Sequence, residues 1–156
     1  MNDRILIAYF SASGVTARAA QQMAEAVGAD LYEIRPAQPY TDADLDWRDQ
    51  HSRSTLEMRD PASRPALADP VPALDGYGTV LLGFPIWWYV EPRIVDTFLE
   101  SADFTGKRVI PFATSGGSGI AGAEKSLRAH CPKADWGDGR LLNSGAAEWA
   151  RQVTGR

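Results

Sequence analysis

The sequence has 156 residues, of which 44% are hydrophobic and 23% are charged, and this composition is typical of one globular domain. The formal net charge of -4 argues against nucleic-acid binding, because phosphate neutralisation needs clustered lysine and arginine. Cys131 is the single cysteine, which excludes an intrachain disulfide, a Cys-x-x-Cys pair and a cysteine-rich metal site. Redox chemistry in this chain would therefore need a cofactor.

The sequence predicts neither a membrane span nor an export signal. The longest apolar run, near residues 80–90, is broken by Gly83 and Pro85 and falls short of the roughly 20 apolar residues of a span. Residues 1–4 lead into a short strand-like stretch without the basic segment, apolar stretch and cleavage site of a signal peptide. We therefore expect a cytoplasmic protein that does not bind membranes.

The N-terminal region is predicted to form a strand, a polar loop and a helix. Residues 5–10 are an apolar run without alternation, as in a strand buried on both faces of a parallel sheet. Apolar residues then recur at helical spacing, with Gly28 in the place of a helix end; they are Val15, Ala19, Met23 and Val27. A second strand is expected at residues 30–34.

The middle of the chain is predicted to be mostly loop. Prolines and mixed charges punctuate residues 36–72, and apolar periodicity is weak there. A short helix is expected within residues 43–58, because the chain must still cross from one parallel strand to the next.

The second half repeats the order of strand, loop and helix. Strands are predicted at residues 79–84 and 108–113, with helices at 91–101 and 120–130. A weak fifth strand is expected at 140–143 and a last helix at 146–153. This alternation predicts one α/β domain over residues 1–156, a three-layer fold with a doubly wound five-stranded parallel sheet. Ligands of such sheets bind at the carboxyl ends of the strands.

The first loop, Ser11-Ala12-Ser13-Gly14-Val15-Thr16, joins a buried strand to a helix start. Free backbone amides and three hydroxyl groups should converge there at the positive end of the helix, which favours an anion. The loop lacks the lysine of a P-loop and the pattern G-x-G-x-x-G, so a phosphate monoester fits better than ATP or NAD. The alternative is that Ser11 or Ser13 simply caps the helix.

The second loop, Phe84-Pro85-Ile86-Trp87-Trp88-Tyr89, carries three consecutive aromatic residues directly after the third strand. Three neighbouring rings would not all face the core, so at least one should be exposed and could stack on a flat heteroaromatic ligand. The alternative, with two rings in the core and one in a protein interface, is equally open from this loop alone.

The third loop, Thr114-Ser115-Gly116-Gly117-Ser118-Gly119, follows the fourth strand. Its glycines would let the backbone wrap around the polar edge of the same flat ligand, although a plain glycine-rich turn is the simpler explanation. Ile120 stands where a G-x-S-x-G nucleophile elbow would need its last glycine, so a serine hydrolase is not indicated.

These three loops together resemble those of the flavodoxin-like FMN proteins. The resemblance is carried by residues 9–16 (YFSASGVT), 82–88 (LGFPIWW) and 109–119 (VIPFATSGGSG), and it extends from residue 5 to about residue 153. It implies a flavodoxin-like fold with strand order 2-1-3-4-5 and FMN as the cofactor.

The resemblance also implies which residues hold FMN. The phosphate would lie against the first loop, at Ser11, Ala12, Ser13, Gly14, Val15 and Thr16. The isoalloxazine would lie between the other two loops, at Pro85, Ile86, Trp87, Trp88, Tyr89, Thr114, Ser115, Gly116, Gly117 and Ser118. Val15 replaces an asparagine that is common in the family, which removes a side-chain contact but keeps the backbone donor. No catalytic residue is expected, because the electron chemistry belongs to the flavin.

Three functions follow from this interpretation. The first is electron transfer with a redox partner protein, either a reductase or an acceptor. The second is an FMN-dependent NAD(P)H:quinone or nitro reductase, which would need room over the flavin for a small quinone. The third is a binding module that has lost the flavin. The sequence leaves the oligomeric state open, and it predicts no metal site, because His51 and His130 lack ligand-like spacing to other ligand residues.

Overall fold

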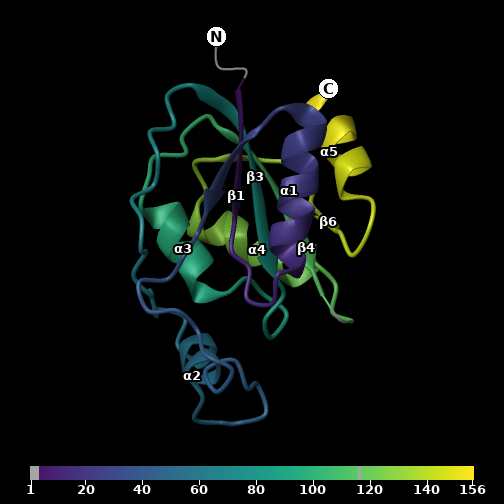
Figure 1. Ribbon diagram of the computed structural model, residues 1–156. Coiled ribbons are helices and arrows are strands. Elements are labelled where there is room, and N and C mark those ends of the chain that lie inside the picture. The colour runs from purple at the N-terminus through teal and green to yellow at the C-terminus, as the bar shows by residue number, and fades with distance from the viewer. Residues whose placement is uncertain (1–3, 116) are drawn as a thin grey trace.

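A parallel β-sheet forms the centre of the protein in the computed structural model, which describes residues 4–115 and 117–156 (Figure 1). The strands are β1 (Arg4–Tyr9), β2 (Asp30–Glu33), β3 (Tyr77–Pro85), β4 (Arg108–Thr114), β5 (Asp135–Trp136) and β6 (Arg140–Leu141). Their order is β2-β1-β3-β4-β5, every pairing is parallel, and β6 also pairs with β4. The predicted doubly wound sheet and its order 2-1-3-4-5 are confirmed.

The fifth position of the sheet differs from the prediction, because two short strands share it where one strand at 140–143 was expected. β5 pairs with the start of β4 and β6 with its end. Pro111 lies between these two pairings and has no amide hydrogen to donate. A side chain at Gly139 would meet the Pro111 carbonyl oxygen at 2.7 Å, so the edge segment bulges past the proline and resumes pairing after it.

Helices cover both faces of the sheet (Figure 1). α1 (Val15–Val27) and α5 (Ala146–Thr154) pack together on one face, and α3 (Arg93–Glu100) and α4 (Ala121–His130) pack together on the other. Two apolar clusters fill the space between these layers and the sheet. None of the helices in the described residues is long and apolar enough to cross a membrane.

The first helix follows the predicted apolar spacing with one difference. Ala19, Met23 and Val27 are buried, and Gly28 ends the helix in the left-handed conformation with φ of 69°. Val15, however, is 48% exposed. It lies at the first residue of the helix, so its side chain faces the loop edge rather than the sheet.

A long excursion, residues 35–76, connects β2 to β3. Its middle part lies below the carboxyl-terminal edge of the sheet, and the chain then returns to the opposite edge, where β3 begins (Figure 1). It contains α2 (Arg53–Arg59), which begins after Ser52, whose hydroxyl oxygen accepts a hydrogen bond from the Thr55 amide. Only the second half of the predicted helix at 43–58 therefore forms. Before it, Asp46 and Asp49 accept hydrogen bonds from backbone amides two residues ahead, which favours turns over a helix.

Close packing between β3 and β4 requires glycine at position 83. A methyl group at Gly83 would lie 2.2 Å from Cζ of Phe112, whose side chain is completely buried. The backbone of β3 therefore lies directly on this ring.

We expect Gly83→Ala to lower the free energy of unfolding by about 1–3 kcal/mol, because the buried ring must move to admit the methyl group. Urea unfolding followed by circular dichroism measures the change. Gly119→Ala is the matched control, since a methyl group at Gly119 meets no atom within 4 Å. Equal urea midpoints for the two variants would contradict this packing argument.

Candidate functional site

The loops after β1, β3 and β4 meet at one edge of the sheet and are joined by hydrogen bonds. The Phe10 amide donates to the Gly83 carbonyl oxygen at 2.9 Å, and the Ile86 amide donates to the Thr114 carbonyl oxygen at 3.0 Å. The hydroxyl groups of Thr16 and Thr114 form a buried hydrogen bond of 2.9 Å. The three loops that the sequence singled out therefore form one continuous surface.

The first loop presents a free helix start. Gly14 is the N-cap residue of α1 with φ of 93°, and no side chain in the described residues caps the first turn. The Ser11 hydroxyl oxygen instead accepts a hydrogen bond from the Gly14 amide at 3.1 Å. The alternative of simple capping by Ser11 or Ser13 is therefore wrong. The first amides of α1 remain without a side-chain acceptor, as in an anion site.

Thr16 differs from the rest of this loop in its surroundings. Ser13, Gly14 and Val15 are exposed, whereas Thr16 is buried and its hydroxyl group is bonded to Thr114. This hydrogen bond fixes α1 against the end of β4. A phosphate contact by the Thr16 hydroxyl group stays a prediction.

The aromatic loop forms a tight turn between Trp87 and Val90, which exchange two backbone hydrogen bonds of 2.9 and 3.1 Å. Trp88 and Tyr89 occupy the centre of this turn with φ of 47° and 71°, a left-handed conformation that is costly for residues other than glycine. Both side chains are exposed as a result, by 42% and 71%. The expectation of at least one exposed ring is confirmed.

Trp87 points the other way and belongs partly to the core. Its ring packs edge-on against Phe10 and Tyr40, with centroid distances of 5.5 and 5.6 Å. The alternative with two buried rings does not hold, because one ring is half-buried and two are exposed.

The third loop is held in place by a residue that the sequence analysis did not identify. Asn143, just after β6, accepts a hydrogen bond from the Ser115 amide at 3.2 Å and donates one to the Ser115 carbonyl oxygen at 2.9 Å. The Ser115 hydroxyl oxygen accepts from the amides of Gly117 and Ser118. Gly116, which was also predicted to contact the flavin, lies outside the described residues.

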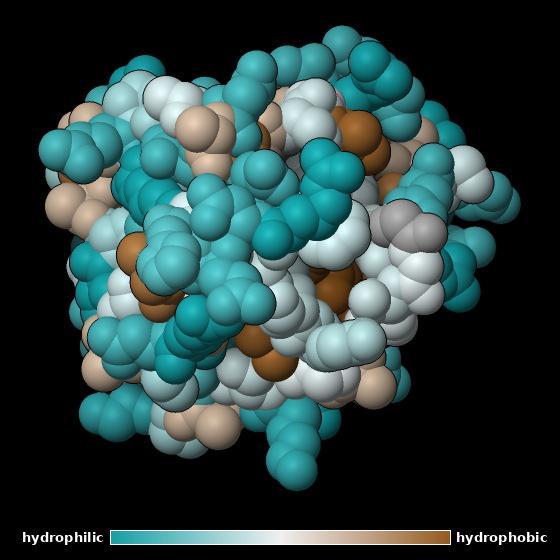
Figure 2. Space-filling view, turned by 90° about the horizontal axis from the view of Figure 1, so that it is seen from below, coloured by the Kyte–Doolittle hydropathy of each residue, from teal (hydrophilic) through white to brown (hydrophobic). Residues whose placement is uncertain are grey.

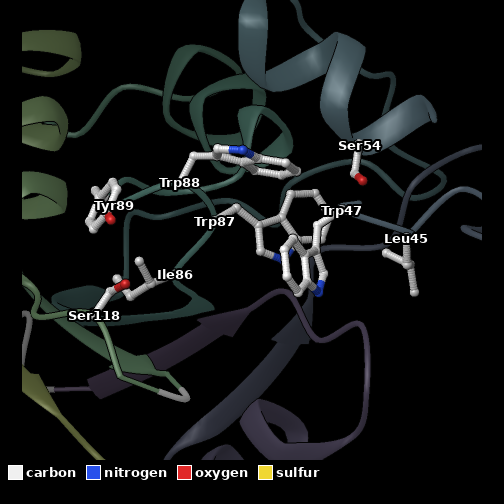
Figure 3. A pocket seen from close by; sticks show the side chains of 8 residues that line it. All are labelled: Leu45, Trp47, Ser54, Ile86, Trp87, Trp88, Tyr89 and Ser118. Atoms are coloured by element: carbon white, nitrogen blue, oxygen red, sulfur yellow. The ribbon is translucent and has the colours of Figure 1, made fainter. Parts of the chain in front are cut away.

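Two adjoining cavities open between these loops. One has a volume of about 340 Å³, and residues of all three loops line it. Its lining residues are Ser13, Val15, Pro85, Ile86, Trp87, Thr114, Ser115 and Asn143. The other, of about 420 Å³, is lined by Ile86, Trp87, Trp88, Tyr89, Ser118, Leu45, Trp47 and Ser54 (Figure 3). They share Ile86 and Trp87, and both fall within the size range of small-molecule sites.

The excursion contributes one wall of the second cavity. Leu45 and Ser54 stand opposite Tyr89 and Ser118 in Figure 3, and Trp47 projects from the same segment with 69% of its surface exposed. The sequence analysis missed these residues, because the excursion carries no pattern that places it under the sheet edge. In Figure 2, which views the protein from this side, apolar surface appears in hollows among hydrophilic residues.

The remaining predicted residues do not line these two cavities. Ser11 and Ala12 line a separate cavity of about 210 Å³, Gly14 forms the helix cap, and Gly117 is exposed. Among the described residues, no charged side chain lines the cavities of about 340 and 420 Å³. A bound anion there would meet only backbone amides, hydroxyl groups and an amide side chain.

A second group of ligand-type residues lies directly behind the aromatic turn. Glu91 and Asp96 are completely buried, and His130 Nδ1 lies 3.7 Å from a carboxylate oxygen of each. Burial, and then the neighbouring Asp96 carboxyl group, raises the pKa of Glu91 to about 9. The sequence did not indicate this group, because His130 lies on a different helix, far along the chain from Glu91 and Asp96.

Comparison with known proteins agrees with this geometry. The sequence profile of the family described as Flavodoxin matches residues 4–153. A structure solved for a candidate flavoprotein of Bacteroides uniformis is similar over 98% of both chains, with 55% identity and a TM-score of 0.92. Another, from Bacteroides eggerthii, has 50% identity and a TM-score of 0.92 over 96% of this chain and 94% of the other. No protein with a curated description matches the chain.

A more distant structure shares the fold. It is a flavoprotein of Lactobacillus acidophilus in complex with FMN, with 18% identity and a TM-score of 0.73 over 94% of this chain and 98% of that one. The family match covers nearly the whole chain, and the sheet order and the three loops have the arrangement that the resemblance implied. The chain belongs to the flavodoxin family.

Proposed function

We propose that this protein binds FMN between the three loops and transfers electrons to or from a redox partner protein. One observation carries the proposal: the uncapped start of α1 borders a cavity that residues of all three loops line. A helix start without a capping side chain is suited to a phosphate group. The FMN that accompanies the Lactobacillus acidophilus flavoprotein supports the choice of ligand.

The residues present fit the two ends of FMN. The Ser13 hydroxyl group and the first amides of α1 would hold the phosphate, and Thr114, Ser115 and Asn143 offer polar groups beside the apolar wall of Ile86 and Trp87. When bound, FMN would supply the electron chemistry. The chain's own task is to bind the cofactor, orient it and exclude water.

The neutral lining of the cavity bears on the redox potential. No arginine or lysine lines it in the described residues, so the charge of the phosphate would remain uncompensated. An uncompensated anion disfavours the addition of further negative charge nearby, which lowers the reduction potential of the flavin. Such a potential is suited to an electron donor.

Exposed aromatic side chains at the cavity edge favour the function of an electron carrier over that of a reductase. Trp88 and Tyr89 are exposed next to the proposed cofactor site, where they would contribute to a docking surface for a partner protein. The reductase function would instead use the second cavity, of about 420 Å³, for a small quinone.

Ser13→Asp should weaken FMN binding at least about tenfold, because the new carboxylate repels the phosphate at the start of α1. Isothermal titration of the cofactor-free protein with FMN measures the loss. Ser13→Asn is the matched neutral variant and should bind FMN nearly as well as the unchanged protein. Riboflavin, which has no phosphate, should bind both variants equally, and a parallel loss of riboflavin would contradict the assignment.

Trp88→Ala should weaken FMN and riboflavin alike, by roughly two- to tenfold, because one stacked ring is lost. Fluorescence quenching of each flavin measures the affinity. Thermal unfolding of the cofactor-free variant is the control, since the ring is exposed and its removal should leave the fold intact. Unchanged affinity for both flavins would show that Trp88 does not face the cofactor.

The carrier function predicts that the FMN-loaded protein is bleached by dithionite and oxidised again by cytochrome c, while NAD(P)H alone leaves its absorbance nearly unchanged. Stopped-flow absorbance measures these rates. Rapid bleaching by NAD(P)H with recovery on adding a quinone would replace the carrier with a reductase. Failure to take up FMN at all would overturn both functions.

A further inference from the structure

We propose that Glu91, Asp96 and His130 form a binding site for a divalent cation, with Zn²⁺ the best suited. Glu91 directly follows the aromatic turn, Asp96 lies in α3 and His130 is the last residue of α4. Each offers one ligand atom, and these atoms lie within 4.8 Å of one another. This site is separate from the proposed FMN site and does not depend on it.

The carboxylates lack the partners that buried acids need. Both side chains are completely buried, and in the described residues Glu91 Oε1 and both carboxylate oxygens of Asp96 accept no hydrogen bond. Glu91 Oε2 accepts a hydrogen bond from the Ser126 hydroxyl group at 2.9 Å. Burying carboxylate oxygens without partners is costly, so this arrangement points to an additional positive group between them.

The neighbouring cations do not balance both acids. Arg93 approaches Asp96 only to 3.9 Å, and its Nη2 atom donates to the Met58 carbonyl oxygen at 2.8 Å. Arg64 is bound to Glu100 at 2.9 Å. Two buried carboxylates thus face one arginine at long range, and a proton or a metal cation has to supply the remaining charge.

The distances suit a small metal ion. A tetrahedral zinc with bonds of about 2.0–2.1 Å separates its ligand atoms by about 3.3 Å, and His130 Nδ1 lies 3.7 Å from both Glu91 Oε2 and Asp96 Oδ1. Both distances from the imidazole nitrogen are thus within a few tenths of an ångström of the spacing of zinc ligands, and all three ligand atoms lie within 4.8 Å of one another. Two carboxylates and one imidazole form a donor set that zinc accepts.

Cation binding would change one hydrogen bond of the histidine. His130 Nδ1 lies 2.8 Å from the Ser126 carbonyl oxygen, so in the cation-free protein this nitrogen carries the hydrogen and donates it there. To act as a ligand, the imidazole ring would turn away from this carbonyl oxygen and bind the cation through the Nδ1 lone pair, with the hydrogen moved to Nε2. The imidazole is also the partly exposed member, at 24%, and borders a cavity of about 570 Å³ through which a cation can arrive.

A cation accounts for more of the arrangement than a proton does. A proton shared by Glu91 and Asp96 would join two of the three unpartnered oxygens, and the imidazole would keep only its hydrogen bond to the Ser126 carbonyl oxygen. A cation would use all three side chains and would tie the end of the aromatic turn to α3 and α4. We therefore expect it to stabilise this part of the fold.

The test begins with protein freed of metal by a chelator, to which Zn²⁺ is added before gel filtration. We expect one equivalent of zinc by mass spectrometry of the metal and a higher thermal midpoint. His130→Gln should reduce zinc affinity at least about tenfold, whereas the matched control His51→Gln, at the exposed second histidine, should retain it. Zinc uptake that is absent, or unaffected by His130→Gln, would overturn the site in favour of a shared proton.

A measurement on the unchanged protein covers the case in which the variant fails to fold. Co²⁺ in place of Zn²⁺ should give the visible absorption of a four-coordinate site with nitrogen and oxygen ligands. A strong sulfur-to-metal band in the near ultraviolet would instead identify Cys131, which borders the same cavity, as a ligand and would overturn the proposed ligand set. Weak binding of several equivalents without this visible spectrum would overturn it too.

Discussion

The parallel pairing of β3 with β1 and β4 is the constraint on which the rest of the structure depends. β3 pairs with β1 as far as Gly83 and with β4 as far as Pro85, where it faces Thr114. Because parallel strands point the same way, their carboxyl ends stop at one edge, and the loops that follow them must meet there. The hydrogen bond from the Ile86 amide to the Thr114 carbonyl oxygen continues this ladder into the site.

Local conformations that are unfavourable in themselves gather at this edge. The first amides of α1 have no capping side chain, and Trp88 and Tyr89 adopt positive φ. Each of these features costs free energy, and the two apolar clusters on the faces of the sheet offset that cost. A rigid sheet with strained loops at one edge is consistent with the proposed binding of a flat cofactor there.

Two kinds of polar environment lie on either side of the aromatic turn. In front of it, the cavities are lined by neutral residues. Behind it, the acidic side chains of Glu91 and Asp96 are completely buried. Val90, which closes the turn through its hydrogen bonds to Trp87, directly precedes Glu91 in the chain.

The pattern of apolar residues in the sequence was sufficient to predict much of the fold. Strands buried on both faces appear as unbroken apolar runs, so residues 5–10, 79–84 and 108–113 were identifiable to within a few residues. The two-residue strands β5 and β6 could not be identified from the sequence, because so short a strand shows no periodic pattern of apolar residues. The division into two strands also depends on Pro111 in the neighbouring strand β4. The conformation of the excursion could not be predicted either, because aspartate side chains there accept hydrogen bonds from nearby backbone amides and so favour turns.

The sequence by itself determined the order of strands, loops and helices, and through the resemblance it identified the three loops of the candidate site. Only the tertiary structure decided that Trp88 and Tyr89 point outward, that Asn143 holds the third loop and that His130 meets Glu91 and Asp96. The physical reason is the range of the interactions. Burial periodicity is a local property of the chain, whereas these contacts depend on how separate elements pack together.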